Sequence, residues 1–312
     1  MAIHVYHEEA DQLREVVLRA APEREVIAWS APAALRAGLH EVQILFAALP
    51  PSDGWERATR LRLIQLMGVG VDTLLPAPSL PASVEIAGMR GAFAAEVSEH
   101  GIAMLLALVR GLPTLLERQR AQTWRPFASR ALAGDTACVV GVGEIGSRLA
   151  RALGGLGMRV VGVARHARPL PHFAEVLGSA DLHVALRAAR VVFVACPLTP
   201  QTRALVDAAA LAALPRGAFV VALSRGAIVD ETALLTALHE GRLGGAALDV
   251  FASEPLSAGH GLWKAPNTIV TPHLAGIGVR YIERAVTELL ANVDRLERGL
   301  RANHRVDREA GY

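Results

Sequence analysis

The chain has 312 residues, 52% of them hydrophobic, which is enough for one large or two medium domains with a sizeable buried core. Its formal net charge is only +2 at pH 7 and its basic residues are scattered among acidic ones, which argues against a nucleic-acid partner. The N-terminus carries no basic segment followed by an apolar one, and no apolar run reaches the roughly 18 residues of a membrane span, so we expect a cytoplasmic protein with no membrane partner.

Residues 1–95 alternate short apolar runs with helical stretches, which is typical of an α/β unit. Three buried strands are predicted here, at 44–49, 63–67 and 84–87. The second of them leads into a Gly-Val-Gly-Val-Asp segment at 68–72. A long helix is predicted over about 94–112, and we expect it to be buried because it is apolar almost all round. A second helical stretch should end near Trp124.

From Thr136 onward the pattern becomes a repeat of strand and helix. The predicted strands are 136–140, 159–163, 191–195, 218–222, 246–249 and 268–271. The last stretch, 281–298, is an amphipathic helix. Strands that alternate with helices in this way predict an α/β fold whose doubly wound parallel sheets carry helices on both faces.

A glycine-rich turn links the strand at 136–140 to the helix that follows it. The segment runs Gly141-Val-Gly143-Glu144-Ile145-Gly146 and matches the G-x-G-x-x-G pattern. The first glycine allows the tight turn, the second lets a pyrophosphate approach the backbone, and the third lets helix and strand pack closely. Unpaired N–H groups at the start of the helix then favour phosphate. The sequence therefore predicts a dinucleotide site at this turn.

The end of the next strand suggests which dinucleotide is bound. Sites that prefer NAD place an acidic residue here to bond the ribose 2′-hydroxyl, and this chain has none. Arg165 stands instead where a 2′-phosphate would need a cation, with His166 and Arg168 nearby. We therefore expect NADP, with NAD possible. The alternative interpretation is that Arg165 is a solvated loop residue.

Three further polar segments follow strands, at the carboxyl ends where doubly wound sheets place their sites. They are Ser224-Arg225-Gly226, Asp249 with Glu254-Pro255, and Thr271-Pro272-His273. With the glycine turn, the 68–72 segment and the 196–202 segment, they resemble the D-2-hydroxyacid dehydrogenase family over almost the whole chain. Two features resemble its short glyoxylate/hydroxypyruvate reductase branch. They are the 68–72 segment and the small residue followed by Arg165 after the strand at 159–163.

The resemblance implies an oxidoreductase that transfers a hydride between NADP(H) and a small 2-keto or 2-hydroxy acid, such as glyoxylate or hydroxypyruvate. Reduction requires a proton for the carbonyl oxygen, which a histidine can supply near neutral pH, and the family pattern gives this role to His273. Glu254 would orient the imidazole and stabilise its protonated form. Arg225 would bind the substrate carboxylate and polarise the carbonyl.

The family pattern also implies binding residues. The backbone N–H groups of Val69 and Gly70 would cradle the substrate carboxylate, and Asp249 would contact the nicotinamide carboxamide. The further cofactor contacts that it implies are Cys196, Pro197 and Thr202. The chain departs from the pattern at Ala222, where the family commonly has Asn, and this puts one hydrogen bond near the cofactor in doubt.

The resemblance implies two Rossmann-like domains, with a cofactor domain at 96–276 inserted into a discontinuous substrate domain made of 1–95 and 277–312. Family members are usually dimers built on the cofactor domain, so a homodimer is expected. Both cysteines, Cys138 and Cys196, lie in apolar runs without a C-x-x-C pattern, and the histidines lack metal-ligand spacing. We therefore expect buried thiols and no metal.

Plainer interpretations exist for each catalytic candidate taken singly. Arg225 could pair with a surface acid, Glu254 could belong to a simple turn, and His273 could be a buried structural histidine. The same machinery also serves dehydrogenases that act on phosphoglycerate, formate or phosphite. A third possibility is a binding protein that senses a dinucleotide without turning it over, as the transcriptional corepressors that resemble this family do.

Overall fold

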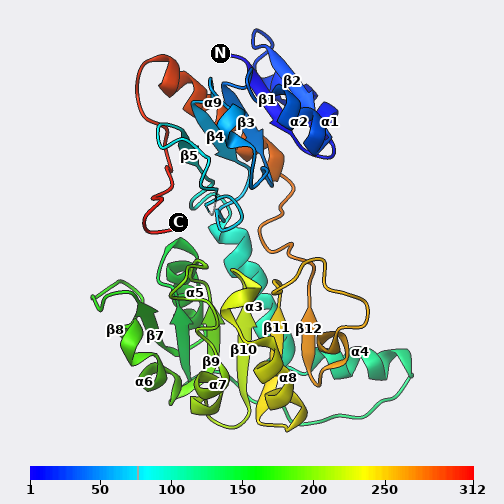
Figure 1. The fold of residues 1–312 in the computed structure, drawn as a ribbon. Coiled ribbons are helices and arrows are strands. Elements are labelled where there is room, and N and C mark those ends of the chain that lie inside the picture. The colour runs from blue at the N-terminus through cyan, green and yellow to red at the C-terminus, as the bar shows by residue number, and fades with distance from the viewer. Residues whose placement is uncertain (76) are drawn as a thin grey trace. The chain divides into compact units, whose positions relative to one another are not determined.

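The computed structural model describes residues 1–75 and 77–312, and the chain divides into two compact units (Figure 1). Unit 1 consists of Met1–Phe93 together with Gly278–Tyr312, and unit 2 is the continuous segment Ala94–Ile277 between them. Each unit is an α/β structure built on its own parallel sheet. The predicted fold class is confirmed.

The sheet of unit 1 has the strand order β2-β1-β3-β4-β5, with all neighbours parallel. Its strands are β1 (Ile3–Tyr6), β2 (Val26–Trp29), β3 (Ile44–Ala47), β4 (Leu63–Leu66) and β5 (Glu85–Ala87). Its helices are α1 (Ala10–Ala20), α2 (Pro32–Gly38) and α9 (Tyr281–Glu297). The strands are short, and β1, β3 and β4 in the middle of the sheet are almost wholly buried, as expected of a parallel sheet covered on both faces.

Helix α9 brings the C-terminal segment back onto the first part of the chain. Its buried positions repeat at helical spacing, from Ala285 through Leu289 to Val293 and Leu296. Among them Asn292 is completely buried and donates to the Gln65 Oε1 atom of β4 at 2.8 Å. A buried amide is stable only when its hydrogen bonds are made, so this pair fixes how α9 lies on the sheet.

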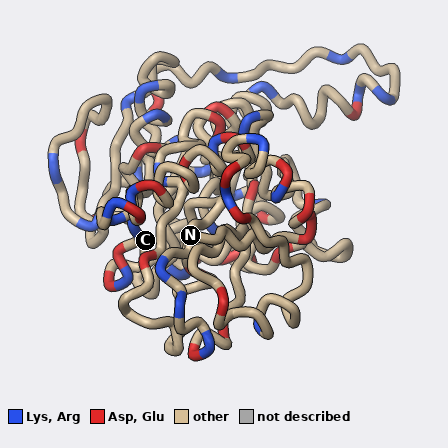
Figure 2. Tube along the Cα trace, turned by 90° about the horizontal axis from the view of Figure 1, so that it is seen from above, with Lys and Arg blue, Asp and Glu red and all other residues tan. Residues whose placement is uncertain are grey.

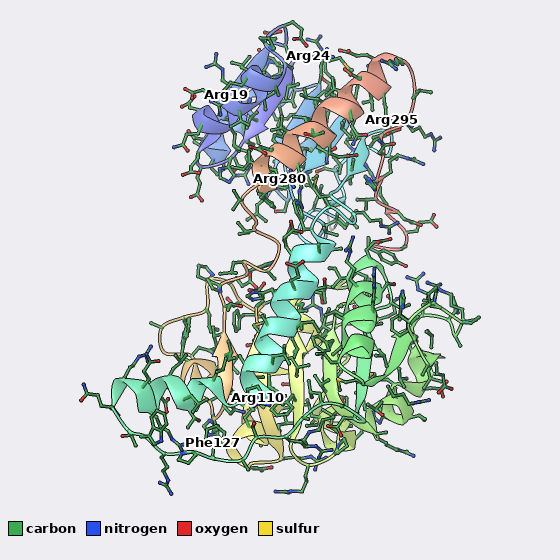
Figure 3. All side chains as sticks on the ribbon, turned by 180° about the vertical axis from the view of Figure 1, so that it is seen from behind. Arg19, Arg24, Arg110, Phe127, Arg280 and Arg295 are labelled. Atoms are coloured by element: carbon green, nitrogen blue, oxygen red, sulfur yellow. The ribbon has the colours of Figure 1, made fainter. Side chains whose placement is uncertain are left out.

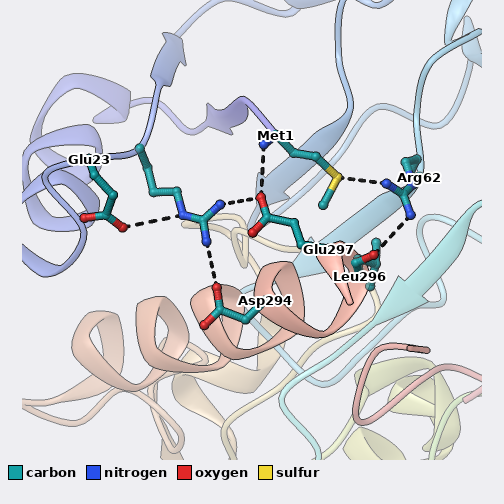
Figure 4. A network of polar contacts seen from close by, with 7 residues as sticks. Met1, Glu23, Arg62, Asp294, Leu296 and Glu297 are labelled. Atoms are coloured by element: carbon teal, nitrogen blue, oxygen red, sulfur yellow. Dashed lines mark hydrogen bonds and ion pairs between the residues drawn. The ribbon is translucent and has the colours of Figure 1, made fainter. Parts of the chain in front are cut away.

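A cluster of charged groups joins the start of the chain to the end of α9 (Figure 4). The Arg24 guanidinium pairs with Glu297 and donates to Asp294 at 2.7 Å, and the N-terminal ammonium of Met1 also reaches Glu297, at 3.1 Å. The hydrogen bond from Arg24 is the main cause of a lowered pKa at Glu297. The cluster therefore links the N-terminal residues of unit 1 to the C-terminal end of α9.

The sheet of unit 2 has seven parallel strands in the order β12-β11-β10-β9-β6-β7-β8. They are β6 (Thr136–Val140), β7 (Arg159–Ala164), β8 (Glu175–Gly178), β9 (Ala189–Val194), β10 (Ala218–Ala222), β11 (Leu243–Leu248) and β12 (Thr268–Val270). The order of the strands reverses between β6 and β9, and open α/β sheets bind their ligands at such a switch point.

Helices cover both faces of this sheet. They are α3 (Ala94–Val109), α4 (Leu112–Arg120), α5 (Glu144–Gly155), α6 (Leu182–Leu186), α7 (Ala208–Ala213) and α8 (Glu231–His239). Helices α3 and α5 pack together, whereas α6, α7 and α8 enclose an apolar core with alternate residues of the strands, such as Val192, Val220 and Leu248. This rigid frame positions the loops at the carboxyl ends of the strands.

Several predicted boundaries differ from the structure. The helix predicted over 94–112 ends at Val109, because Gly111 adopts a positive φ of 65° that turns the chain into α4. Helix α4 ends at Arg120 rather than near Trp124. The predicted strands do not include β1, β2 and β8, each of which has only four residues. Within the described ranges no single helix could cross a membrane, and only α3 and α4 together, bent by 66°, meet the length and composition.

Charged residues of both signs are interspersed along the trace (Figure 2). Runs of like charge are short, in keeping with the formal net charge of +2.

Candidate active site

The glycine turn follows β6 at the switch point of the unit 2 sheet. Gly141 has a φ of 101°, and a Cβ there would lie 2.5 Å from the backbone nitrogen of Cys196. A Cβ on Gly146 would lie 1.9 Å from the carbonyl oxygen of Gly141. Only glycine fits either position, so turn, helix and neighbouring loop are packed backbone to backbone.

Helix α5 opens directly from this turn. Gly143 is its exposed N-cap residue, and a Cβ there would meet nothing within 4 Å. Glu144 and Ile145 form the first turn of the helix, whose backbone N–H groups have no partner within the helix. An open space bordered by such N–H groups fits a phosphate or pyrophosphate. The residues present therefore fit the predicted dinucleotide.

The loop after β9 lies beside the glycine turn. The Ala195 N–H donates to the carbonyl of Val140 at 2.8 Å, which ties the two strand ends together. Thr202 Oγ1 donates to the Pro197 carbonyl at 2.7 Å and accepts from the Thr199 N–H at the same distance, so this hydroxyl closes the loop.

Cys196, at the start of that loop, is buried against the glycine turn. Burial raises the pKa of its thiol to about 12, and it does the same to Cys138 in β6. Both side chains therefore remain neutral thiols near pH 7 and act as small packing groups.

A histidine and a carboxylate pair at the ends of β11 and β12. His273 Nδ1 lies 2.6 Å from Glu254 Oε2, and Glu254 Oε1 accepts the Phe251 N–H at 2.8 Å. Because an ionised carboxylate can only accept, the proton of this bond belongs to Nδ1 of His273. The imidazole is 44% exposed, so its Nε2 edge is the one left for a ligand.

Several effects act on the pKa of Glu254. Burial raises it, but the hydrogen bonds from His273 and from the Phe251 N–H, with the charges of His273 and Arg225, together bring it below its ordinary value. Glu254 is therefore ionised at neutral pH and accepts the Nδ1–H of His273.

Arg225 belongs to the same group of side chains. It follows β10, next to β11 in the sheet, and its Nη1 donates to the Ser224 carbonyl at 2.8 Å. Its charge contributes to lowering the pKa of Glu254. The carboxyl ends of three adjacent strands, β10, β11 and β12, thus bring together a guanidinium, a carboxylate and an imidazole. This set can bind an anion and transfer a proton.

Asp249 lies in the same region but has a different environment. Its side chain is completely buried, and both carboxylate oxygens accept hydrogen bonds from the turn at 271–275. Val69 and Gly70 belong to unit 1, directly beyond β4, where Val69 is half-exposed.

A comparison with protein-family models identifies the family of the chain that carries these residues. The model of the D-isomer specific 2-hydroxyacid dehydrogenase NAD-binding domain matches residues 102–275, which is more than half of the chain. The chain belongs to the D-isomer specific 2-hydroxyacid dehydrogenase family. The resemblance inferred from the motifs is confirmed, and the protein is an oxidoreductase of this family.

Curated relatives and solved structures agree with this assignment. Glyoxylate/hydroxypyruvate reductase A of Klebsiella pneumoniae (strain 342) is 31% identical over 258 residues, covering 81% of this chain and 82% of the relative. The structure of an NADPH-dependent glyoxylate/hydroxypyruvate reductase from Sinorhizobium meliloti, in complex with NADP and sulfate, is 30% identical with a TM-score of 0.89, covering 100% of this chain and 99% of that one. A family member from Xanthobacter autotrophicus Py2, in complex with NADPH and MES, is 30% identical with a TM-score of 0.85 and 99% coverage of each chain.

In this dehydrogenase the end of β7 carries cations rather than an acid. Ala164 is the last residue of the strand, and Arg165 and His166 follow it as exposed residues. An acidic residue that could bond a ribose 2′-hydroxyl is absent from 164–168. The two side chains predicted to contact a 2′-phosphate, Arg165 and His166, are thus at the surface of unit 2.

The structure also identifies residues near the site that the motifs left without a role. Thr271 donates to Asp249, and His100 on α3 lies 3.1 Å from the Thr271 hydroxyl. Glu231, the first residue of α8, accepts the Ala252 N–H at 2.6 Å in the loop that carries Glu254. Only Thr271 had a sequence signal, its place before Pro272-His273. The other contacts join residues that are far apart in the chain.

Proposed function

We propose that this enzyme reduces a small 2-keto acid, such as glyoxylate or hydroxypyruvate, with NADPH. The observation that carries the proposal is the Glu254–His273 pair beside Arg225, at the carboxyl ends of adjacent strands. The names of the relatives support the choice of acid, since a reductase with 82% of its length matched is named for these two compounds.

The proposed reduction follows from the geometry of the Glu254–His273 pair. NADPH, when bound, supplies the hydride to the carbonyl carbon. His273 holds a proton at Nε2 and donates it to the carbonyl oxygen, so the products are the 2-hydroxy acid and NADP⁺. Glu254, ionised and bonded to Nδ1, orients the imidazole so that Nε2 faces the substrate. Arg225 binds the substrate carboxylate and draws electron density from the carbonyl.

The cofactor would be held by backbone and cationic groups. The N–H groups of Gly143, Glu144 and Ile145 would bind the pyrophosphate above the close-packed Gly141 and Gly146. The Cys196-Pro197 segment, closed by Thr202, would border the cofactor on the β9 side of the switch point. Arg165 and His166 would bind the 2′-phosphate, and the solved NADP and NADPH complexes of relatives support this choice of cofactor.

The cofactor assignment is tested by kcat/KM with NADPH and with NADH. Arg165→Ala should lower kcat/KM for NADPH by about tenfold to hundredfold, since a charge-assisted hydrogen bond contributes ~1.5–3 kcal/mol, and should hardly change it for NADH. Arg159→Ala is the matched control, because Arg159 starts the same strand and makes only a half-exposed ion pair with Glu175. A wild-type enzyme that prefers NADH would refute the assignment.

The reaction is tested with a panel of oxidants that includes glyoxylate, hydroxypyruvate and phenylpyruvate. His273→Gln should retain NADPH binding and lose at least a hundredfold in kcat, because general acid catalysis contributes about 10²–10⁴-fold. Full activity of His273→Gln would refute the role of His273. Tight NADPH binding without turnover of any 2-keto acid would refute the enzyme and favour a dinucleotide-sensing protein.

We also propose that the enzyme is a homodimer built on unit 2. Helix α4 has no buried residue, and its Leu115 and Leu116 are exposed, as are Trp124 (98%) and Phe127 in the segment that follows. This helix and segment run along the outside of unit 2 (Figure 3). Apolar side chains gathered in this way are typical of an interface, and a second copy presents the same surface for a symmetric contact.

Sedimentation velocity tests the dimer. Leu116→Glu combined with Trp124→Ser should give monomers at concentrations where the wild type sediments as a dimer. Leu300→Glu is the control, since Leu300 in unit 1 is exposed to the same extent (50% against 51% for Leu116) but lies outside this surface. A monomeric wild type, or a double variant that stays dimeric, would contradict the proposal.

A further inference from the structure

His273 sits in an unfavourable backbone conformation. Its φ is 50°, in the left-handed region that side chains other than glycine rarely adopt. Such a conformation persists only when surrounding contacts hold it. Here the direction of the imidazole, and hence of its proton, depends on the turn at 271–275.

Asp249 holds this turn from β11. Its backbone carbonyl accepts the His273 N–H at 2.8 Å. Its Oδ1 atom accepts the Leu274 N–H at 3.0 Å and its Oδ2 atom accepts the Ala275 N–H at 2.9 Å. Three consecutive N–H groups of the turn are therefore bonded to one buried residue, and both of its carboxylate oxygens are used in doing so.

Thr271 closes the other side of the turn. Its hydroxyl donates to Asp249 Oδ1 at 2.6 Å, and its backbone N–H donates to the Leu248 carbonyl at 2.9 Å. Because the hydroxyl proton is directed at the carboxylate, the Thr271 oxygen can only accept from the Nε2 atom of His100, 3.1 Å away. Nε2 of His100 therefore carries a proton.

These bonds form one directed chain from α3 to the turn. His100 donates to Thr271, Thr271 donates to the Asp249 carboxylate, and that carboxylate accepts the N–H groups of Leu274 and Ala275, which follow His273 directly. His100 Nε2 is also 3.7 Å from Asp249 Oδ1. The Asp249 side chain is completely buried, and the His100 side chain is only 20% exposed.

We propose that His100, Thr271 and Asp249 are positioning residues for His273, which keep the turn in the conformation that pairs Nδ1 with Glu254 and directs Nε2 to the substrate. The inference rests on the proposed role of His273 as the proton donor. It gives Asp249 a task different from the nicotinamide contact that the family resemblance implies. Loss of the hydrogen bonds that link His100, Thr271 and Asp249 would lower the rate of proton transfer, whereas the affinity for NADPH and for substrate would remain.

Thr271→Val and Thr271→Ser form the decisive pair. Valine keeps the shape of threonine and removes the hydroxyl, so kcat should fall by about tenfold to hundredfold, the effect of losing a hydrogen bond to a charged group. The KM for glyoxylate and the Kd for NADPH should stay close to those of the wild type, whereas the midpoint of thermal unfolding should fall, because Asp249 and His100 each lose a hydrogen-bond partner. Thr271→Ser keeps the hydroxyl and should restore most of kcat.

His100 provides an independent pair on another element. His100→Gln can still donate to Thr271 from its amide, whereas His100→Leu cannot, so kcat should fall severalfold more in the leucine variant at unchanged Kd for NADPH. This pair decides the matter if Thr271→Val fails to fold. Equal kcat values in the two His100 variants would overturn the positioning role of the hydrogen bond from His100 to Thr271.

His273→Gln separates this inference from the proposed function. If His273→Gln keeps full kcat, the proposed function itself fails. If His273→Gln is inactive while Thr271→Val keeps full kcat, the proton donor stands and the positioning role is overturned. A Thr271→Val variant that loses NADPH affinity in step with kcat would show a general structural role, which also overturns it.

Discussion

Replacement of Gly146 by alanine tests the close packing under the cofactor. The added Cβ would lie 1.9 Å from the carbonyl oxygen and 3.0 Å from the carbonyl carbon of Gly141. Both atoms belong to the backbone of the turn, so no side chain can rotate away. Since non-bonded carbon atoms rest at ~3.5–4.0 Å, the start of α5 must move away from the turn by more than about 1 Å.

The size of the effect follows from that displacement. Overpacking of a well-packed region costs ~1–3 kcal/mol, and we expect Gly146→Ala to lose about this much in the free energy of unfolding. The N–H groups proposed to bind the pyrophosphate move with the helix, so a comparable loss in cofactor binding raises the Kd for NADPH about tenfold to hundredfold, at 1.4 kcal/mol per factor of ten.

Fluorescence titration with NADPH and urea unfolding measure the two quantities. Gly154→Ala is the matched control on the same helix, because its Cβ would meet nothing within 4 Å. Alanine is a better helix former than glycine by ~1 kcal/mol, so this control should leave Kd unchanged and should not reduce the free energy of unfolding. A Gly146→Ala protein whose Kd for NADPH stays within threefold of the wild-type value would refute the reasoning.

Two further predictions concern stability. Asn292→Leu leaves the Gln65 Oε1 atom and the Asn303 N–H without their partners. Each unpaired group costs roughly 1–3 kcal/mol, so the urea midpoint of unfolding should fall clearly. An unchanged midpoint would contradict this. The pKa of Glu254 is lowered, so its ionised form stabilises the folded state fully above the ordinary value of 4.5 and progressively less as pH falls through the lowered value. The unfolding free energies of the wild type and Glu254→Gln should therefore converge in acid, and a difference that stays constant as the pH falls would argue against the bond to His273.

The sequence alone could predict features that depend on short spacing. The strands 136–140 and 218–222 have the same bounds in the structure, because a buried parallel strand is a continuous apolar run between turns. The glycine turn was readable for the same reason, since its requirements fall within six consecutive residues. The end of the long helix was missed, because the positive φ at Gly111 depends on how the following segment folds back.

The order of the motifs along the chain therefore identifies the family, the α/β class and the residue types at the strand ends. The family resemblance implies that Glu254 meets His273, whereas the contact of His100 with Thr271 is visible only in the folded structure. Glu254 and His273 are 19 positions apart, and His100 and Thr271 are 171 apart, yet each pair is within hydrogen-bond reach. Adjacent parallel strands end at one edge of the sheet, and α3 packs against them, so contacts across that edge depend on strand order rather than on distance along the chain.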